Sequence, residues 1–382
     1  MISHLWLPLI PRSGFLGRLR QLRLRVVEVE AAGVSNSLRE NAEFWQVLLS
    51  AELAPEKANA VLAEIESQSL SPLAQLLSGR LLTPGEQNRA RGADQTALQQ
   101  ALRQGAKFLF PDEYPDRLHE GVAPSVLMAW GDPSVLKAPC VGIVGTRSAS
   151  SYGKACAQKL SESLARCGVT ILSGGAGGID AHAHTGALDA RGATVAVLPC
   201  GIDIAYPKAH ENLYRAIRER GCLISQFAAG RKPFEHDFLT RNTLIAALSD
   251  VLVVVEAPAK SGALSTAKAM LDLGRDVLVV PGPIDRFGFR GSHALIREGA
   301  TLIDHPDHVL EYLGLPPLAE AEPVAANDLQ AQLLHILSQE PATAETLAVK
   351  LDQSITEILG ELTMLELEGV IVRNERGFAK AP

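Results

Sequence analysis

The sequence predicts an α/β protein whose main domain is a Rossmann-like, mostly parallel sheet, with a helical domain before it and a winged-helix domain after it. Seven short apolar runs alternate with amphipathic stretches between residues 140 and 303. The first hundred residues show only the helical spacing of apolar side chains. The chain ends in three helical patterns and a short hairpin pattern. We therefore expect domains at residues 1–105, 106–315 and 328–382, with a linker at 316–327.

The N-terminal region is expected to be helical. Residues 44–53, 71–82 and 96–103 each place apolar side chains on one helical face. No motif typical of a catalytic site occurs in this region.

The middle region predicts a parallel sheet that helices cover on both faces, because its apolar runs are nearly continuous and are separated by helical patterns. The expected strands lie at residues 140–145, 169–173, 193–198, 222–225, 250–257, 276–281 and 301–303. Gly192, Gly221 and Gly274 stand where left-handed C-terminal caps of helices are expected.

The C-terminal region begins after a stretch rich in proline, alanine and acidic residues, which is typical of an extended, solvated linker. Residues 329–338 and 343–350 predict two helices. A capping box of Ser354 and Glu357 opens a third, and residues 370–379 predict a hairpin. Three helices and a hairpin are the winged-helix pattern.

The charge is distributed unevenly along the chain. The net charge of the 382 residues is −7. Residues 140–310 hold 18 basic and 16 acidic groups, a net of +2, and residues 327–382 hold 4 and 9, a net of −5. A role in binding nucleic acid therefore belongs to the middle region, because phosphate repels acidic surfaces.

The location expected for the protein is the cytoplasm. No run of 18 apolar residues exists, so no membrane span is expected. The positive charges Arg12, Arg18 and Arg20 follow the apolar start, whereas a secretory signal has them before it. The five cysteines form no CxxC pair, which favours reduced thiols.

The candidate site lies at one edge of the expected sheet. Five loops leave the carboxyl ends of the strands: GTRSASSYG (145–153), SGGAGGIDAHAH (173–184), PCGIDIAYPKAH (199–210), EAPAKSGALSTA (256–267) and PGPIDRFG (281–288). Ligands of open parallel sheets bind at this edge. Glycines let the backbone approach a phosphate closely, and the N–H groups at a helix start point toward it. Arginine can make a bidentate contact to a phosphate. The expected DNA-binding residues are Gly145, Arg147, Ser173, Gly174, Gly175, Lys208, Arg241, Asn242, Ser261 and Gly262.

Several other interpretations of these residues remain open. Arg147 pairing with Glu256 or Asp180 would make it structural. His182 and His184 lack a nearby third ligand, so we expect no metal. Ser173, Ser261 and Thr266 lack a nucleophile elbow and an ordered acid and base, so no catalytic residue is expected. Neither GIVGTR (142–147) nor GAGGID (175–180) completes a dinucleotide fingerprint, although a modified nucleotide site stays possible.

These loops resemble the DNA-processing protein A (DprA, or Smf) family. The similar motifs are VGTRSASSYG, ILSGGAGGIDAHAHTGAL, VLPCGIDIAYPKAH, FLTRNTLIAALSD, EAPAKSGALSTA and VPGPIDRFGFRGSHALIREGA, and the similarity extends over residues 107–303. The resemblance implies a mediator of natural transformation that binds incoming single-stranded DNA, protects it and loads the RecA recombinase. It also implies a homodimer without cofactors, an N-terminal SAM-like helical domain and a C-terminal winged helix.

The family pattern assigns roles to particular residues. Arg147 matches a Gly-x-Arg contact to DNA, Ser173 and Gly174 match a Ser-Gly loop, and Lys208 matches a basic contact after Tyr-Pro. Arg241 and Asn242 match the Phe-Pro-x-Arg-Asn-Arg element. Leu239 and Thr243 depart from that element, and the lost charge at Thr243 leaves Arg231 and Lys232 as possible replacements.

Further expectations concern aromatic side chains and interfaces. Phe234, Phe238 and Tyr206 are possible stacking partners for bases, with core packing as the commoner role. Residues 291–303 are a candidate dimer surface by resemblance, or the final helix and strand of the core. The acidic helix at 354–368 predicts contacts with protein and not with DNA.

Two other functions compete with DNA binding. One is a nucleotide sensor or an enzyme like the phosphoribohydrolases, but the loop AKSGALSTA lacks their PGGxGT pattern. The other is a scaffold that recruits the recombinase without binding DNA.

Overall fold

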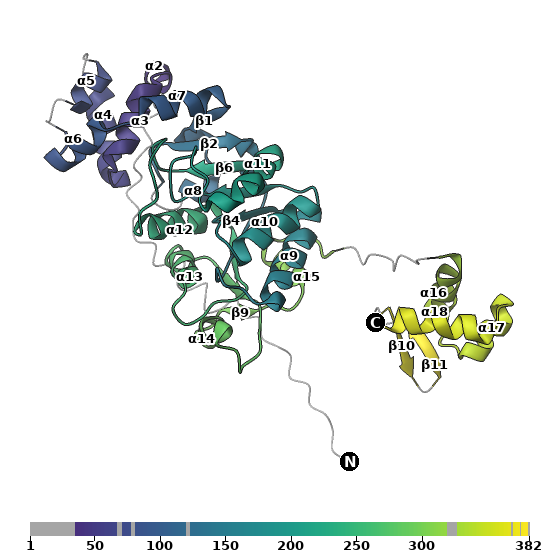
Figure 1. The fold of residues 1–382 in the computed structure, drawn as a ribbon. Helices are drawn as coiled ribbons and strands as arrows, with labels where there is room; N and C mark the ends of the chain where they lie inside the picture. Colours follow the sequence, from purple (N-terminus) through teal and green to yellow (C-terminus); the bar gives the residue numbers. More distant parts are fainter. Residues whose placement is uncertain are drawn as a thin grey trace. The chain divides into compact units, whose positions relative to one another are not determined.

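The chain folds into two compact units, Met1–Leu315 and Pro316–Pro382. The computed structural model describes residues 35–66, 71–77, 81–119, 123–318, 327–367, 370–374 and 376–380. Most of the expected linker at 316–327 lies outside these residues. Figure 1 shows the first unit with its central sheet and the second unit with its three helices and hairpin.

The first unit is built on a nine-stranded sheet with the order β1-β2-β6-β5-β4-β3-β7-β8-β9. Strands β3 to β9 pair in parallel, and β1 and β2 add an antiparallel edge. The strands are β1 Ala106–Leu109, β2 Leu127–Gly131, β3 Cys140–Val144, β4 Thr170–Ser173, β5 Thr194–Val197, β6 Cys222–Ser225, β7 Val251–Val254, β8 Val277–Val279 and β9 Thr301–Leu302. The seven strands expected from the sequence are confirmed, and the prediction missed β1 and β2.

The apolar runs form strands because helices bury them on both faces. All residues of β3 to β8 are buried, as a parallel sheet between two helical layers requires. Helices α9, α10 and α11 pack beside one another, and α12 packs on α13 across the sheet from them (Figure 1). The helices from α9 to the end of the first unit are α9 Ser151–Arg166, α10 Ile179–Asp189, α11 Glu211–Arg220, α12 Asp237–Leu248, α13 Gly262–Asp272, α14 Arg290–Arg297 and α15 Pro306–Tyr312.

The helices before the sheet belong to the same unit. They are α2 Asn36–Arg39, α3 Ala42–Ala51, α4 Pro55–Glu66, α5 Pro72–Leu77, α6 Pro84–Arg91 and α7 Gln95–Arg103. Trp45 packs edge-on against Phe44 and Phe110, with ring centroids 5.1 Å apart in each pair. The buried Gln46 amide donates to Asp94 O and Ala229 O at 3.0 and 2.9 Å. Gln46 therefore fastens α3 to the loop after β6.

Short helical turns complete the first unit. They are η1 Pro111–Glu113, α8 Asp116–His119, η2 Pro133–Lys137, η3 Lys208–His210 and η4 Phe287–Phe289. Of the three expected left-handed glycine caps, only Gly274 has a positive φ, at 69°. Arg191 takes the left-handed conformation in place of Gly192. Gly221 is extended, and it is a glycine position because a Cβ there would collide with Thr194 O.

The second unit has the winged-helix arrangement expected from the sequence. Its elements are α16 Asp328–Gln339, α17 Ala344–Leu351, α18 Ile355–Leu367 and the antiparallel strands β10 Ile371–Asn374 and β11 Gly377–Lys380. The capping box is confirmed, because Glu357 N donates to Ser354 Oγ at 3.2 Å and Ser354 N donates to the Glu357 carboxylate at 3.4 Å. Leu333, Leu347 and Leu362 lie in a core that belongs to this unit.

Candidate nucleic-acid interface

A cleft lies where the connections of the sheet change direction. β3 is paired with β4 on one side and with β7 on the other, so the loops after β3 and β7 diverge and leave a space between them. The space has a volume of about 420 Å³. Its walls come from residues 144–147, from α12 and from residues 258–266, which include the first turn of α13.

Arg147 is an exposed cation in the wall of this cleft. It lies on the loop after β3, and the centre of its guanidinium lies 4.9 Å from the ring of Phe238 on α12. The Tyr206 ring lies 5.7 Å from that of Phe238, so the loop after β5 reaches the same group. Stacking on Phe238 orients the guanidinium while its edge remains open to a phosphate.

Arg241 contrasts with Arg147, because its side chain is buried. Its Nη1 donates to the carbonyls of Gly174 and Val197, the latter at 2.8 Å, and its Nε donates to Asn242 Oδ1 at 3.1 Å. Burial lowers the pKa of the guanidinium, and the carboxylate of Asp180 opposes that shift. The structure differs in part from the expectation that Arg241 offers its charge to DNA, because its Nη1 meets two backbone oxygens and its Nε meets the Asn242 side chain.

The glycine loop after β4 is also closed by the protein itself. Gly174 N donates to Asp180 Oδ2 at 3.1 Å, and Ala176 N points to the same atom at 3.4 Å. Burial raises the pKa of Asp180, although Arg241 and these N–H groups favour its charged form. A carboxylate of the chain thus occupies the place that the sequence suggested for a phosphate.

Ser173, Gly174 and Gly175 are all buried, contrary to the expectation of DNA contacts there. The Ser173 hydroxyl donates to Ile143 O at 2.6 Å. A Cβ on Gly174 would collide with the guanidinium of Arg241, and one on Gly175 would lie 2.5 Å from the Tyr214 hydroxyl. These glycines are needed for close packing under the cleft.

Asn242, Ser261 and Gly262 line the cleft together. The Asn242 amide donates to Gly262 O at 3.2 Å and to Ser265 Oγ at 2.9 Å, so it ties α12 to α13 and has no donor left for a base. Ser261 caps α13 by accepting from Ala263 N at 3.3 Å. The positive end of the α13 dipole faces the cleft, which suits an anion.

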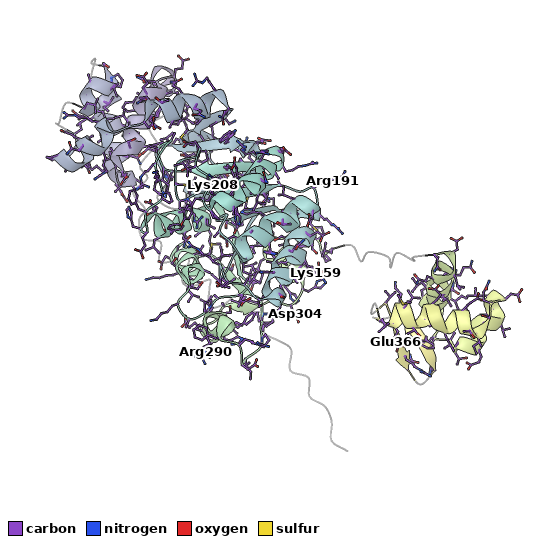
Figure 2. The ribbon with its side chains drawn as sticks, in the orientation of Figure 1. Lys159, Arg191, Lys208, Arg290, Asp304 and Glu366 are labelled. Carbon is purple, nitrogen blue, oxygen red and sulfur yellow. The ribbon has the colours of Figure 1, made fainter. Side chains whose placement is uncertain are left out.

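Lys208 lies outside the cleft walls, exposed on η3 in the loop after β5 (Figure 2). Two contacts hold this loop and α11 against the glycine loop: the His210 ring meets Gly175 O at 2.9 Å, and the Tyr214 hydroxyl lies between Tyr206 O at 2.6 Å and Gly175 O at 3.0 Å. Gly145 packs against Ile179 and Glu256 O, and this close contact positions the loop that carries Arg147. Arg147 and Lys208 therefore lie on loops of the same edge, with the glycine loop after β4 between them.

The sequence analysis missed or undervalued several residues of this edge. Lys260 is exposed and lines the cleft, and the only signal for it was its place two residues before a helix start. Tyr206 and Phe234 are 39% and 57% exposed, so core packing, the commoner role, does not describe them. Arg231, a possible replacement for the charge missing at Thr243, is paired with Glu52 and Asp237.

The acids and histidine named in the other interpretations have partners within the chain. The buried Glu256 carboxylate accepts from Ser150 N and Oγ at 3.0 and 2.7 Å, and Asp180 accepts from the glycine loop. His184 is buried against Thr194 Oγ1 at 2.7 Å, and burial lowers its pKa to about 3. Within the described residues, no cluster of His, Cys, Asp and Glu has the arrangement of a metal site.

Comparison with known proteins identifies the family. The family described as DNA recombination-mediator protein A matches residues 106–314, more than half of the chain. The chain belongs to this family. The DprA winged helix domain matches residues 316–375, in agreement with the second unit.

Relatives in this recombination-mediator family come from several bacteria. A DprA-type DNA processing protein of Mycobacterium tuberculosis is 38% identical over 304 residues, covering 73% of this chain and 78% of its own. Protein Smf of Escherichia coli is 35% identical over 268 residues, covering 67% and 72%. These proteins share most of their length with this chain.

Two solved structures of DNA processing protein A share the fold. That from Streptococcus pneumoniae has a TM-score of 0.61 at 32% identity and covers 71% of this chain and 97% of its own. That from Helicobacter pylori, which shows a single-stranded DNA binding mode, has a TM-score of 0.50 at 30% identity and covers 55% and 95%. No helix in the described part of the present chain combines the length and apolarity needed to cross a bilayer.

Proposed function

We propose that the chain binds single-stranded DNA along the carboxyl edge of its sheet, with the cleft between β3 and β7 as the main contact. The observation that carries the proposal is the grouping of Arg147, Phe238 and the first turn of α13 around one open space. Membership of a recombination-mediator family and the DNA binding of the H. pylori relative support it.

The exposed residues of this edge would make different contacts with DNA, according to their chemistry. Arg147 and Lys260 bind phosphates in the cleft, and Lys208 extends the line of positive charges to the loop after β5. Tyr206 offers an exposed ring to a base. All these contacts are available for any sequence, as expected of a protein that coats incoming strands.

The wider role follows from the family and from the exposed edge. We infer that the chain protects incoming DNA and loads RecA during natural transformation, in the cytoplasm, without catalysis or a cofactor. It would act as a homodimer through residues 291–303, which form α14 and β9. β9 is the last strand of the sheet and both its residues are exposed, so this edge suits a second copy.

Contacts within the protein favour this function over a nucleotide enzyme. Phosphate-binding enzymes of this fold class use free amides of a glycine loop, but here Gly174 N donates to the chain's own Asp180. Incubation with nucleoside monophosphates should release no base. Release of a base that Arg147→Ala abolishes would favour the enzyme instead.

The deciding experiment is a titration of fluorescent oligo-dT by anisotropy over a range of salt. We expect tight binding at low salt that weakens steeply, with a slope of roughly 0.7 per phosphate contact in a log–log plot. Arg147→Ala and Lys208→Ala should each weaken binding and reduce the slope by about one contact. Lys159→Ala, an exposed cation on the outer face of α9, is the matched control (Figure 2). Unchanged binding in both test variants would contradict the proposal.

A further inference from the structure

The loop after β8 exposes an unusual set of side chains. Phe287 is 64% exposed and Ile284 is 92% exposed, although both are large and apolar. Arg286 and Arg290 flank the ring and are exposed, and the guanidinium of Arg290 lies 5.3 Å from the Phe287 ring. We call Arg286, Phe287 and Arg290 the ledge; Arg290 is labelled in Figure 2. Nothing in the cleft described above uses these residues.

The ledge stands on a firmly held loop. Phe289, two residues after Phe287, is buried. The Tyr152 hydroxyl donates to Pro281 O at 2.9 Å, and the His293 ring meets Gly282 O at 3.1 Å. Because the backbone is fixed on both sides, a ligand that binds the ledge loses little conformational entropy from the loop.

The ledge also adjoins the cleft. The N–H groups of Gly291 and Ser292, at the start of α14, donate to Ala257 O at 2.8 and 3.1 Å, and Pro258 is already a wall of the cleft. Gly288 packs against the Glu256 carboxylate, which also holds the loop of Arg147 through Ser150. One buried acid thus joins the ledge to the site of Arg147.

The order of the strands puts the ledge on the opposite side of the cleft from Lys208. Along the edge, β5, β4, β3, β7 and β8 follow one another, so Lys208 follows the first of these strands and the ledge follows the last. Four strand spacings correspond to about 19 Å, a span that requires several nucleotides. A strand held by Lys208 and the cleft would leave toward Phe287.

We propose that the ledge is a second contact for single-stranded DNA, in which a base stacks on Phe287 while Arg286 and Arg290 bind the flanking phosphates. An exposed aromatic ring between two cations is the combination that holds single strands without regard to sequence. One acid, Asp285, lies among them, so the ledge keeps a positive charge. The inference rests on the proposed function, because it extends the path of the same strand.

The test compares oligo-dT of six and of thirty nucleotides with the full-length protein. Phe287→Ala should weaken binding of the long oligonucleotide on the order of tenfold, since one base stacked on an aromatic ring contributes about 1–3 kcal/mol. It should leave the short one unchanged and should not alter the salt slope. Arg290→Ala should reduce that slope by roughly 0.7. Phe287→Trp should restore binding, because indole stacks as well.

Controls separate this inference from the proposed function. Lys159→Ala, the exposed cation on α9 that serves as the control above, should behave like the wild type with both lengths. If Arg147→Ala weakens both lengths but Phe287→Ala weakens neither, the ledge is wrong and the cleft stands. If neither variant weakens binding, both fail. If Phe287→Ala changes only the oligomeric state in sedimentation, the ledge is an interface between copies, and the inference is overturned.

Discussion

The cleft has an open half and a closed half, and both carry an arginine. In the open half, Arg147 is exposed and touches only the face of Phe238 among the contacts described. In the closed half, Arg241 is 4% exposed, and its donors meet Gly174 O, Val197 O and Asn242. Both side chains line the same space.

The difference shows that the role of an arginine in a sequence motif depends on which of its N–H groups already have hydrogen-bond partners in the protein. The Nε and Nη1 donors of Arg241 meet oxygens of α12, β5 and the loop after β4, so fewer of its five donors are available for phosphate than in Arg147. A guanidinium that stacks on an aromatic ring by its face, as that of Arg147 does, still has the N–H groups of its edge available to bind a ligand. The closed half therefore shapes the cleft, and the open half binds.

The largest effect is expected from the closed half, on stability. Arg241→Met leaves the buried Asp180 without its compensating charge and the carbonyls of Gly174 and Val197 without a donor. Leaving a buried carboxylate without a compensating charge and two buried carbonyls without a donor should lower the free energy of unfolding by about 3–5 kcal/mol, measured by urea denaturation.

The comparison with the open half supplies the control for this measurement. Arg147→Ala should change the free energy of unfolding by no more than about 0.5 kcal/mol, since its side chain is exposed. Equal stability of the two variants would remove the distinction between the halves.

A second effect is expected from acid, at the buried His184 of α10. His184 is buried and neutral, with a pKa of about 3 against an ordinary value of 6.5. Because the folded-state pKa is the lower one, the stability that neutral His184 contributes is complete above pH 6.5 and is lost as the pH falls toward 3. At pH 5 the loss should be about 2 kcal/mol, at 1.4 kcal/mol per pH unit.

The measurement compares His184→Gln with the wild type in urea at pH 7 and pH 5. The variant should lose less stability than the wild type between these two values, by about 2 kcal/mol. Parallel losses in the two proteins would show that His184 takes up a proton in the folded state.

The two halves also show how far the sequence could lead. Apolar runs and their spacing predicted β3 to β9, because continuous burial between helices leaves a plain trace in composition. The sequence also predicted which edge of the sheet carries the site, because ligands of parallel sheets bind at the carboxyl ends of the strands. β1 and β2 were missed because residues 106–109 and 127–131 are short and lie within a region without strand periodicity.

The roles of individual residues were less predictable. Gly174 and Arg241 have the sequence signature of a phosphate site, yet Asp180 and backbone carbonyls fill it. The contact between Arg241 and Gly174 joins residues 67 positions apart, so no local pattern reveals it. The last glycine missing from GAGGID was the one available sign, because Asp180 stands in its place.

A smaller effect on DNA binding is expected from a contact between the N-terminal helices and α12, which forms part of the open half of the cleft. Arg231 binds both oxygens of Asp237, at 2.6 and 3.0 Å, and its Nε donates to Glu52 at 2.5 Å. Asp237 is the first residue of α12 and precedes Phe238, on which Arg147 stacks. Glu52→Gln should therefore weaken binding of oligo-dT about fivefold, a cost of roughly 1 kcal/mol.

The sign of this change makes the test sharp. Removing an acid should strengthen DNA binding if charge alone mattered. Glu43→Gln replaces an exposed acid in the first turn of α3, the helix that Glu52 follows, and measures that general effect. If Glu52→Gln strengthens binding as much as Glu43→Gln does, then Arg231 does not position α12.

The smallest effect on DNA binding is expected from the second unit. Its helix α18 has no Lys or Arg, while Glu357 and Glu366 are exposed on it, so it repels phosphate where a DNA-reading winged helix would be basic. Elsewhere in the unit, Lys350 is paired with Glu340 at 2.9 Å. Removal of residues 316–382 should leave the affinity for oligo-dT within about twofold, less than 0.5 kcal/mol.

The isolated unit provides the complementary measurement, because it has a core of its own around Leu333, Leu347 and Leu362. Residues 327–382 should not retard duplex DNA in a gel at physiological salt. Retardation would mean that the wing, where Arg376 and Lys380 lie, overcomes the acids of α18. The exposed apolar side chains of α18, among them Leu359, Met364 and Leu367, suit contacts with protein instead. Basic charge at the cleft and acidic charge on α18 would then serve different classes of partner.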